Sequence, residues 1–255
     1  MTESQADDEF QLQKTLYQSR NPTRRWLHTS RRDRVLRAIA EASPHRGRRA
    51  LEVGPGGGPY LPALCRQFDR VTAIDNNPAF IGALQPLAAE HGNLSLRQAD
   101  LLTEIWPEPW DLVLCSEVLE HVPDPDRFVG GLARATAPGG ILVLSTPQPW
   151  STMELTCRIG LSPALIGLMR RIYNEPVLPT GHISLRSKRR VLGLLAKHRF
   201  DVLHSETFGL YLPLLAEFGG SAAVSIASAG ERLLNRIGFT GPLWTQLHVA
   251  RKAAD

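Results

Sequence analysis

Residues Leu51–Gly58 read LEVGPGGG, and this stretch decides the fold predicted for the 255-residue chain. A short, mostly apolar run ends at Gly54, and three more glycines follow at positions 56–58. Glycine lacks a Cβ and adopts positive φ readily, so the backbone here can approach a ligand closely. Glycines between a strand and a helix are typical of a nucleotide-type site, although a plain strand-to-helix turn has the same pattern.

The composition indicates one globular domain, because 43% of the residues are hydrophobic and the net charge is only +4. The polar N-terminus predicts no signal peptide, and no clean apolar run reaches the roughly 18 residues that a membrane span needs. Three cysteines without ligand-like spacing favour a reducing, cytoplasmic setting. Arginines gathered in residues 20–49 fit a nucleic acid, an anionic lipid surface, an acidic substrate or a solvated helix face.

Apolar runs and helical patterns alternate along the first part of the chain. Strands are expected at about 49–53, 70–75, 94–99, 111–115 and 141–145. Helices are expected at about 30–42, 60–68, 78–90 and 125–135, with Asn21-Pro22 interpreted as a turn. Strands that are apolar throughout, with helices between them, indicate a parallel sheet covered on both faces.

The regular alternation of strands and helices ends after residue 146. The first mixed segment, 147–185, is followed by a predicted helix at about 187–198 and a predicted strand at about 200–205. The second mixed segment, 209–241, precedes a last predicted strand at about 245–250. We therefore predict a single domain over residues 1–255, with a helical N-terminal cap at 1–45. The two mixed segments are predicted to form the lid and the acceptor pocket.

Polar residues follow the predicted strands, at the sheet edge where parallel sheets bind ligands. Asp75 ends the second strand, 21 positions after Gly54, a distance that suits a carboxylate bonded to ribose hydroxyls. Asp100 ends the third strand, where an acid can pair with an adenine amino group. The segment SEVLEHV, residues 116–122, directly follows the fourth strand. A dinucleotide dehydrogenase would share Asp75 but has no general need for the other two features.

Five spaced motifs resemble the class I S-adenosylmethionine-dependent methyltransferases: LEVGPGGG, AIDNNP, QADLL, DLVLCSEVLEHVPDPDRF and APGGILVLSTPQ. Within that class the chain is most similar to the ubiquinone-biosynthesis O-methyltransferase group, through NPTR at 21–24, CSEVLEHVPDP, LSTPQ and LPTGH at 178–182. The resemblance covers about residues 21–209. It implies an α/β, Rossmann-like, doubly wound and mostly parallel seven-stranded sheet with an antiparallel last strand and helical insertions after strands five and six.

The resemblance also implies that S-adenosylmethionine binds and leaves as S-adenosylhomocysteine. It places the ribose at Asp75 and Asn76, the adenine beside Asp100 and Leu101, and the sulfonium near Ser116. The methionine end would lie over the glycine turn, with the implied contacts being Glu52, Gly54, Gly56 and Gly58. In the group an arginine of the NPxR pattern contacts the cofactor, which is Arg24 here. The longer gap before the glycine turn leaves Arg25 and Arg31 as alternatives.

Glu117, Glu120 and His121 are spaced i, i+3 and i+4, which predicts one shared face of a helical turn. With His182 as a fourth ligand they could hold Mg²⁺, Mn²⁺ or Zn²⁺. Related patterns bind a metal in ubiquinone-pathway enzymes and in small-RNA methyltransferases, whereas many members of the class use them only for hydrogen bonds. Without a metal, His121 is the first candidate for the general base and His182 the second, with Glu117 completing the predicted catalytic set.

The leading hypothesis is O-methylation of a small phenolic, natural-product or lipid-like acceptor. Attack on a sulfonium methyl needs positioning, and a hydroxyl nucleophile also needs a base or a metal. The alternatives are N- or C-methylation, metal-dependent RNA 2′-O-methylation, and a degenerate fold that only binds a partner. Nucleic acid is disfavoured because no RNA-binding module is recognisable. Apolar insertions fit an apolar acceptor, a membrane surface or ordinary packing, and both monomer and homodimer remain open.

Overall fold

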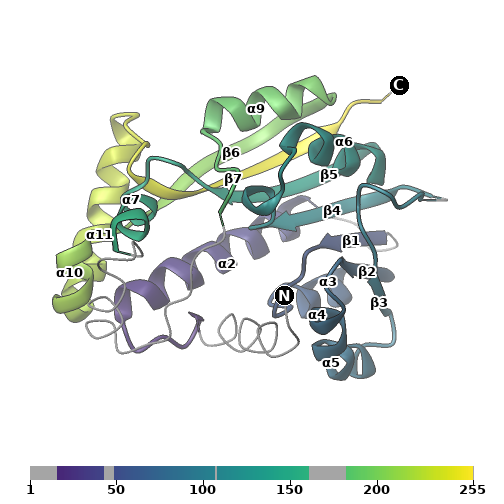
Figure 1. Cartoon of the computed structure of the whole chain (residues 1–255), viewed down its shortest axis with the longest axis horizontal. Coiled ribbons are helices and arrows are strands. Elements are labelled where there is room, and N and C mark those ends of the chain that lie inside the picture. The colour runs from purple at the N-terminus through teal and green to yellow at the C-terminus, as the bar shows by residue number, and fades with distance from the viewer. Residues whose placement is uncertain (1–15, 43–48, 107, 161–181, 255) are drawn as a thin grey trace.

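The computed structural model describes residues 16–42, 49–106, 108–160 and 182–254 (Figure 1). The N-terminal part of the predicted cap and residues 161–181 of the first mixed segment lie outside these residues. No helix in the described ranges combines the length and the apolar character needed to cross a bilayer.

Seven strands form one sheet in the order β3-β2-β1-β4-β5-β7-β6. All neighbouring pairs from β3 to β5 are parallel, and β7 runs antiparallel to both β5 and β6. The strands are β1 (Arg49–Val53), β2 (Arg70–Asp75), β3 (Leu94–Gln98), β4 (Trp110–Ser116), β5 (Thr136–Pro147), β6 (Phe200–Leu210) and β7 (Leu243–Lys252). The predicted doubly wound, seven-stranded sheet with an antiparallel last strand is confirmed.

Helices cover both faces of the sheet (Figure 1). One face carries α2 (Pro22–Ala42), α3 (Leu61–Gln67), α4 (Pro78–Ala83) and α5 (Gln85–Glu90). The other carries α6 (Pro125–Ala135) and α9 (Lys188–Lys197). Neighbouring residues of one strand serve opposite cores: Leu112 packs with Ile39 and Leu64, whereas Val113 packs with Leu132 and Val191. Two buried faces explain why these strands read as continuous apolar runs.

Helix α2 begins earlier than the sequence predicted, and the interpretation of Asn21-Pro22 as a plain turn is wrong. The Asn21 side chain accepts hydrogen bonds from the backbone N–H groups of Thr23 (2.9 Å) and Arg24 (3.1 Å). Asn21 is therefore the cap, and Pro22 occupies the first helical position, where its missing N–H does no harm. The early turns were hidden because their buried side chain, Leu27, packs against residues far along the chain, Tyr211 and Trp244.

Two further boundaries differ from the prediction. The helix expected at 78–90 is split at Leu84 into α4 and α5, with a proline in the first turn of each. Strands β6 and β7 are longer than expected, because they pair with each other from Phe200↔Lys252 to Leu210↔Leu243. This pairing shortens the second insertion to α10 (Pro213–Phe218) and α11 (Gly220–Arg236). With α7 (Thr152–Gly160) they lie at one end of the molecule, beside the start of α2 (Figure 1).

Candidate active site

The site lies where the chain reverses its direction across the sheet. From β1 the chain moves outward to β2 and β3, and then returns to place β4 on the other side of β1. Loops leave the carboxyl ends of β1 and β4 in opposite directions, which opens a crevice between them. A cavity of about 630 Å³ occupies this place. Its walls come from the glycine turn, the segment after β4, α2, α7, His182 and Trp244.

The glycine turn has the backbone conformation that the sequence predicted. Gly54, Gly56 and Gly58 have φ of 67°, 51° and 70°, values that strain other residues. Gly54 and Gly56 line the cavity, and a Cβ on Gly54 would lie 2.5 Å from Val118 Cγ2. Gly58 is placed differently, since it is buried and a Cβ there would lie 2.8 Å from Leu84 Cδ2. In this structure Gly58 permits close helix packing.

Glu52 presents a buried carboxylate at the base of the cavity. Its side chain is 2% exposed, and burial raises its pKa to about 8. Glu52 Oε2 has no hydrogen-bond partner among the described residues. A buried acceptor without a partner suits a ligand group that donates hydrogen bonds, such as an ammonium group.

The acids predicted to hold adenosine lie at the same sheet edge, Asp75 as the last residue of β2 and Asp100 shortly after β3. Asp75 is partly exposed and accepts a hydrogen bond from the Asn77 backbone N–H at 2.8 Å. Asp100 is exposed and accepts one from the Leu102 N–H at 2.9 Å. In the described ranges neither these acids nor Asn76 and Leu101 belong to the cavity lining, and the Leu101 side chain packs in the core. The assignment of these four residues to adenosine stays a prediction.

The three arginines left open by the sequence have different surroundings. Arg24 donates to Glu217 Oε2 at 2.6 Å and so ties α2 to α10. Arg25 donates to the backbone oxygen of Ser19. Arg31 is the one that lines the cavity, where it lies 5.0 Å from the Trp244 ring centroid. The structure therefore favours Arg31 over Arg24 for contact with a ligand.

Glu117 does not share a helical face with Glu120 and His121, so that expectation is wrong. Its backbone N–H still pairs with Ser145 O, as a continuation of the sheet, and its φ is +59°. Only Leu119–His121 form a short 3₁₀ turn, η1. The positive φ turns the Glu117 carboxylate toward α2, where Arg31 Nη1 donates a hydrogen bond to it at 2.7 Å. The carboxylate also accepts a hydrogen bond from Ser145 Oγ of β5 at 2.9 Å.

Ser116 lies at the end of β4, on the wall shared with the glycine turn. Its hydroxyl is 2.8 Å from Ser145 Oγ and 3.3 Å from the Tyr60 hydroxyl. Both Ser116 and Tyr60 line the cavity. Ser116 therefore faces the cavity, and its place near the sulfonium stays a prediction.

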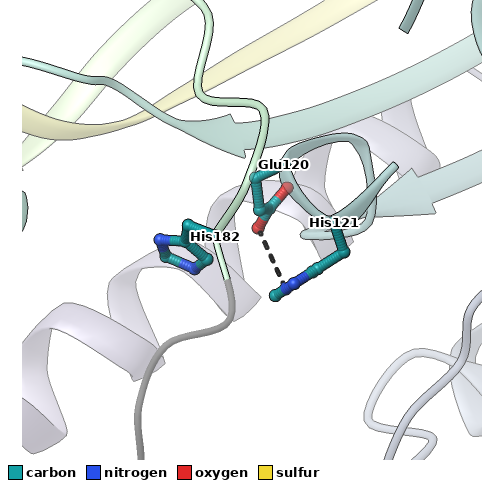
Figure 2. A group of neighbouring side chains, drawn as sticks. All are labelled: Glu120, His121 and His182. Carbon is teal, nitrogen blue, oxygen red and sulfur yellow. Dashed lines mark ion pairs between the residues drawn. The ribbon is translucent and has the colours of Figure 1, made fainter. Parts of the chain in front are cut away.

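Glu120, His121 and His182 form a cluster in which one ligand atom of each lies within 4.8 Å of the others (Figure 2). Glu120 Oε2 accepts from Thr146 Oγ1 at 3.0 Å, while Oε1 has no hydrogen-bond partner among the described residues. His121 Nε2 is 4.0 Å from Glu120 Oε1. Burial, reinforced by the negative charge of Glu117, raises the pKa of Glu120.

Backbone hydrogen bonds bring His182 to this cluster from far along the chain. The N–H groups of Ile183 and Ser184 both donate to Glu120 O at 2.9 Å. Of the four predicted metal ligands, the fold thus brings three together and pairs the fourth, Glu117, with Arg31. One carboxylate and two imidazoles fit Mn²⁺ or Zn²⁺ better than Mg²⁺, which prefers oxygen ligands. The unpartnered Glu120 Oε1 supports this fit.

Two residues of the site were missed from the sequence. Glu154 of α7 is 3% exposed, and its oxygens lie 3.3 Å from Trp244 Nε1 and 3.0 Å from His182 Nδ1. Trp244 in turn lies in β7, 90 residues from Glu154. No local pattern could have revealed contacts between segments so far apart.

The strand order, the single reversed strand and the glycine turn at the point of reversal are those of the class I methyltransferase fold. The chain belongs to the methyltransferase domain family, whose model matches residues 24–205. It is 45% identical over 172 residues to a ubiquinone biosynthesis O-methyltransferase of Xylella fastidiosa, covering 66% of this chain and 65% of that protein. It therefore spans just under two thirds of that relative.

Two other proteins extend the comparison. The chain is 31% identical over 189 residues to the ubiquinone biosynthesis O-methyltransferase of Paracidovorax citrulli, covering 72% of this chain and 76% of that protein. Among solved structures, it is similar to the N-methyltransferase NodS of Bradyrhizobium japonicum in complex with S-adenosylhomocysteine, with a TM-score of 0.63. That match covers 98% of this chain and 97% of NodS at 17% identity, so it shows the fold alone.

Proposed function

We propose that the chain transfers the methyl group of S-adenosylmethionine to a hydroxyl oxygen of a small acceptor. The new C–O bond forms as the S–CH₃ bond breaks, and S-adenosylhomocysteine and a proton are released. The observation that carries the proposal is that one cavity joins the glycine turn to the cluster of Glu120, His121 and His182. The methyl donor and a group able to take a proton can therefore meet in one space.

The cofactor end of the cavity supports this arrangement. Glu52 offers its unpartnered oxygen to the ammonium group of the methionine moiety, and the glycine turn lets the backbone approach the ligand. Arg31, already on the cavity wall, supplies positive charge for a carboxylate. The ribose is assigned to Asp75 with Asn76 and the adenine to Asp100 with Leu101, at the carboxyl ends of the adjacent strands β2 and β3.

The other end of the cavity supplies the proton chemistry. Glu120, His121 and His182 would hold a divalent ion such as Mn²⁺ or Zn²⁺. When bound, such an ion would lower the pKa of an acceptor hydroxyl. Without an ion, His121, whose side chain is 43% exposed and lines the cavity, would accept the released proton, with His182 as the second candidate. Glu117 contributes by holding Arg31 on the wall.

The acceptor is proposed to be a small phenolic or lipid-like molecule. The curated relatives named above are ubiquinone biosynthesis O-methyltransferases, which favours an oxygen acceptor over nitrogen, carbon or RNA. Aromatic and apolar side chains on the cavity wall suit such an acceptor: Tyr17, His28, Met153, Cys157 and Trp244. Helices α7 and α10–α11, with the cap helix α2, are proposed to form the acceptor end of the domain.

Binding of S-adenosylmethionine to Asp75→Ala tests the cofactor assignment. We expect the affinity, measured by calorimetry, to fall at least tenfold, because a ribose hydroxyl loses its charged acceptor. Asp69→Ala is the matched control, since Asp69 is an exposed aspartate that precedes the opposite end of β2. Unchanged affinity in Asp75→Ala would refute the ribose assignment. Absence of binding to the unaltered chain would refute the proposed function itself.

We further propose that α10 and α11 contact an anionic lipid surface inside the cell. Large apolar side chains are exposed along both helices and just after them: Leu214, Phe218, Ile226, Leu233, Ile237 and Phe239. Exposed charges beside them are the cations Arg232 and Arg236. The acids of these helices, Glu217 and Glu231, are paired with Arg24 and Arg34. Exposed apolar and cationic groups together suit an anionic membrane.

Sedimentation with vesicles of phosphatidylglycerol and phosphatidylcholine tests this contact. We expect the double variant Leu214→Ser and Phe218→Ser to reduce the bound fraction at least threefold, because these side chains are 79% and 76% exposed. Ile105→Ser is the control, since Ile105 is 88% exposed but follows β3, at the other end of the sheet. Equal binding by the double variant and the control would overturn the proposal.

A further inference from the structure

We propose that Glu154 is a positioning residue that holds the His182 imidazole with its Nε2 lone pair directed at Glu120 and His121. The inference rests on the proposed function, in which His182 acts at the reacting end of the cavity. It adds a residue of the first insertion to the site and assigns that residue a chemical task.

The Glu154 carboxylate is held rigidly on α7. Its backbone N–H bonds to Ser151 Oγ at 3.2 Å in the first turn of the helix, and its side chain is 3% exposed. Oε1 lies 3.3 Å from Trp244 Nε1, and Oε2 lies 3.0 Å from His182 Nδ1. Both oxygens are therefore engaged, and each partner comes from a different part of the chain.

The hydrogen bonds select one form of the His182 ring. An ionised carboxylate only accepts hydrogen bonds, and the indole N–H of Trp244 only donates. Glu154 Oε2 therefore requires a proton on His182 Nδ1, which leaves Nε2 of the neutral ring as the acceptor. A carboxylate behind a histidine serves this purpose at many metal and acid–base sites, where it sets the tautomer and the direction of the ring.

The orientation of the ring agrees with this assignment. In Figure 2 one nitrogen of His182 faces the space beside Glu120 and His121, and the other points away from it. The His121 and His182 rings are 5.1 Å apart between centroids, at an angle of 61°. Backbone bonds from Ile183 and Ser184 to Glu120 O hold the main chain, so the remaining freedom is rotation of the imidazole. The hydrogen bond between Glu154 Oε2 and His182 Nδ1 restricts that rotation.

The test measures the tautomer directly, by nitrogen NMR of the ¹⁵N-histidine-labelled full chain at about pH 8, where an ordinary imidazole is neutral. The His182 signals are assigned by their loss in His182→Asn. We expect the unaltered chain to show His182 protonated on Nδ1. In Glu154→Gln we expect this preference to be lost, because the amide can donate to Nδ1 and stabilise the other tautomer.

Calorimetry with Mn²⁺ gives a second readout. We expect Glu154→Gln to bind Mn²⁺ about 10- to 100-fold more weakly, the usual cost of losing such a hydrogen bond behind a ligand. Glu154→Asp, which keeps the charge, should restore part of both the tautomer preference and the affinity. Asp126→Asn is the matched control: Asp126 Oδ1 lies 3.0 Å from His198 Nε2, and neither residue lines the cavity. It should change the His198 signals and leave those of His182 alone.

The outcomes separate this inference from the proposed function. A proton on Nε2 of His182 in the unaltered chain, or the same tautomer in Glu154→Gln as in the unaltered chain, would overturn the role of Glu154. Lower thermal stability of Glu154→Gln with an unchanged tautomer would show a structural role only, and would also overturn it. If His182 is protonated on Nδ1 as expected but the chain does not bind Mn²⁺, the positioning role of Glu154 is supported and the metal is removed from the proposed function.

Discussion

Gly54→Ala is expected to destabilise the fold by about 2–5 kcal/mol. A left-handed backbone costs an alanine about 1–2 kcal/mol, and Gly54 has a φ of +67°. The new methyl group would also lie 2.5 Å from Val118 Cγ2, an overpacking that costs about 1–3 kcal/mol. Because Gly54 lines the cavity, the affinity for S-adenosylmethionine should fall more than tenfold as well. Urea unfolding and calorimetry measure the two effects.

Gly139→Ala separates the two causes of this destabilisation. Gly139 has a similar φ of +74°, but a Cβ there would meet no atom within 4 Å. It should therefore show only the backbone cost and retain full cofactor affinity. Adding Val118→Ala to Gly54→Ala should relieve the clash and recover the stability lost to it, which a double-mutant cycle would show as a favourable coupling between the two substitutions. If Gly54→Ala were no less stable than Gly139→Ala, the close approach to Val118 would not exist.

Glu120→Gln is expected to lower kcat/KM at least 100-fold and to weaken Mn²⁺ binding by a similar factor. The variant keeps the size of the side chain, but it exchanges the charged oxygen at the centre of the cluster for a neutral amide. The unfolding free energy should stay the same or rise, because a buried carboxylate disfavoured by its surroundings is removed. Steady-state kinetics with added Mn²⁺, calorimetry and urea unfolding measure the three effects.

Glu117→Gln is the companion variant and should behave in the opposite way. Glu117 pairs with Arg31, whose side chain is only 9% exposed, so its loss leaves a buried cation without an anion. We expect about 3 kcal/mol of destabilisation, with Mn²⁺ affinity within threefold of the unaltered chain. The reverse pattern, with Glu117→Gln losing the metal and Glu120→Gln retaining it, would refute a metal site made of Glu120, His121 and His182. Full activity of the enzyme in the presence of a chelator would refute only the proposed metal dependence.

The core of the fold was predictable from local patterns. Runs such as Leu112–Cys115 are apolar at every position because both faces of the strand are buried, and this signal is present in the strand itself. The glycine turn was equally readable, because positive φ and close approach impose glycine at particular positions. The spacing from Gly54 to Asp75 reflects one strand–helix–strand unit of ordinary length.

The site was predictable only in part. Spacing placed Glu117, Glu120 and His121 on one helical face, but sheet pairing of Glu117 with Ser145 and a positive φ turned its carboxylate away. The exposed stripe on α10–α11 could not be distinguished from a buried one by sequence, since both have the same helical period. Asn21-Pro22 fits both a turn and a helix cap, and the residues that pack on the following turns decided between them.

By itself the sequence determined the doubly wound sheet, the position of the ligand crevice and the class of protein, because these depend on residue order and on the steric demands of glycine. Only the tertiary structure decided which charges meet: Arg31 with Glu117, and His182 with Glu120 and Glu154. These partners lie 86 and 28 residues apart for the pairs Arg31–Glu117 and Glu154–His182. Electrostatic and hydrogen-bond partners are chosen by distance in space, and a residue pattern records distance along the chain.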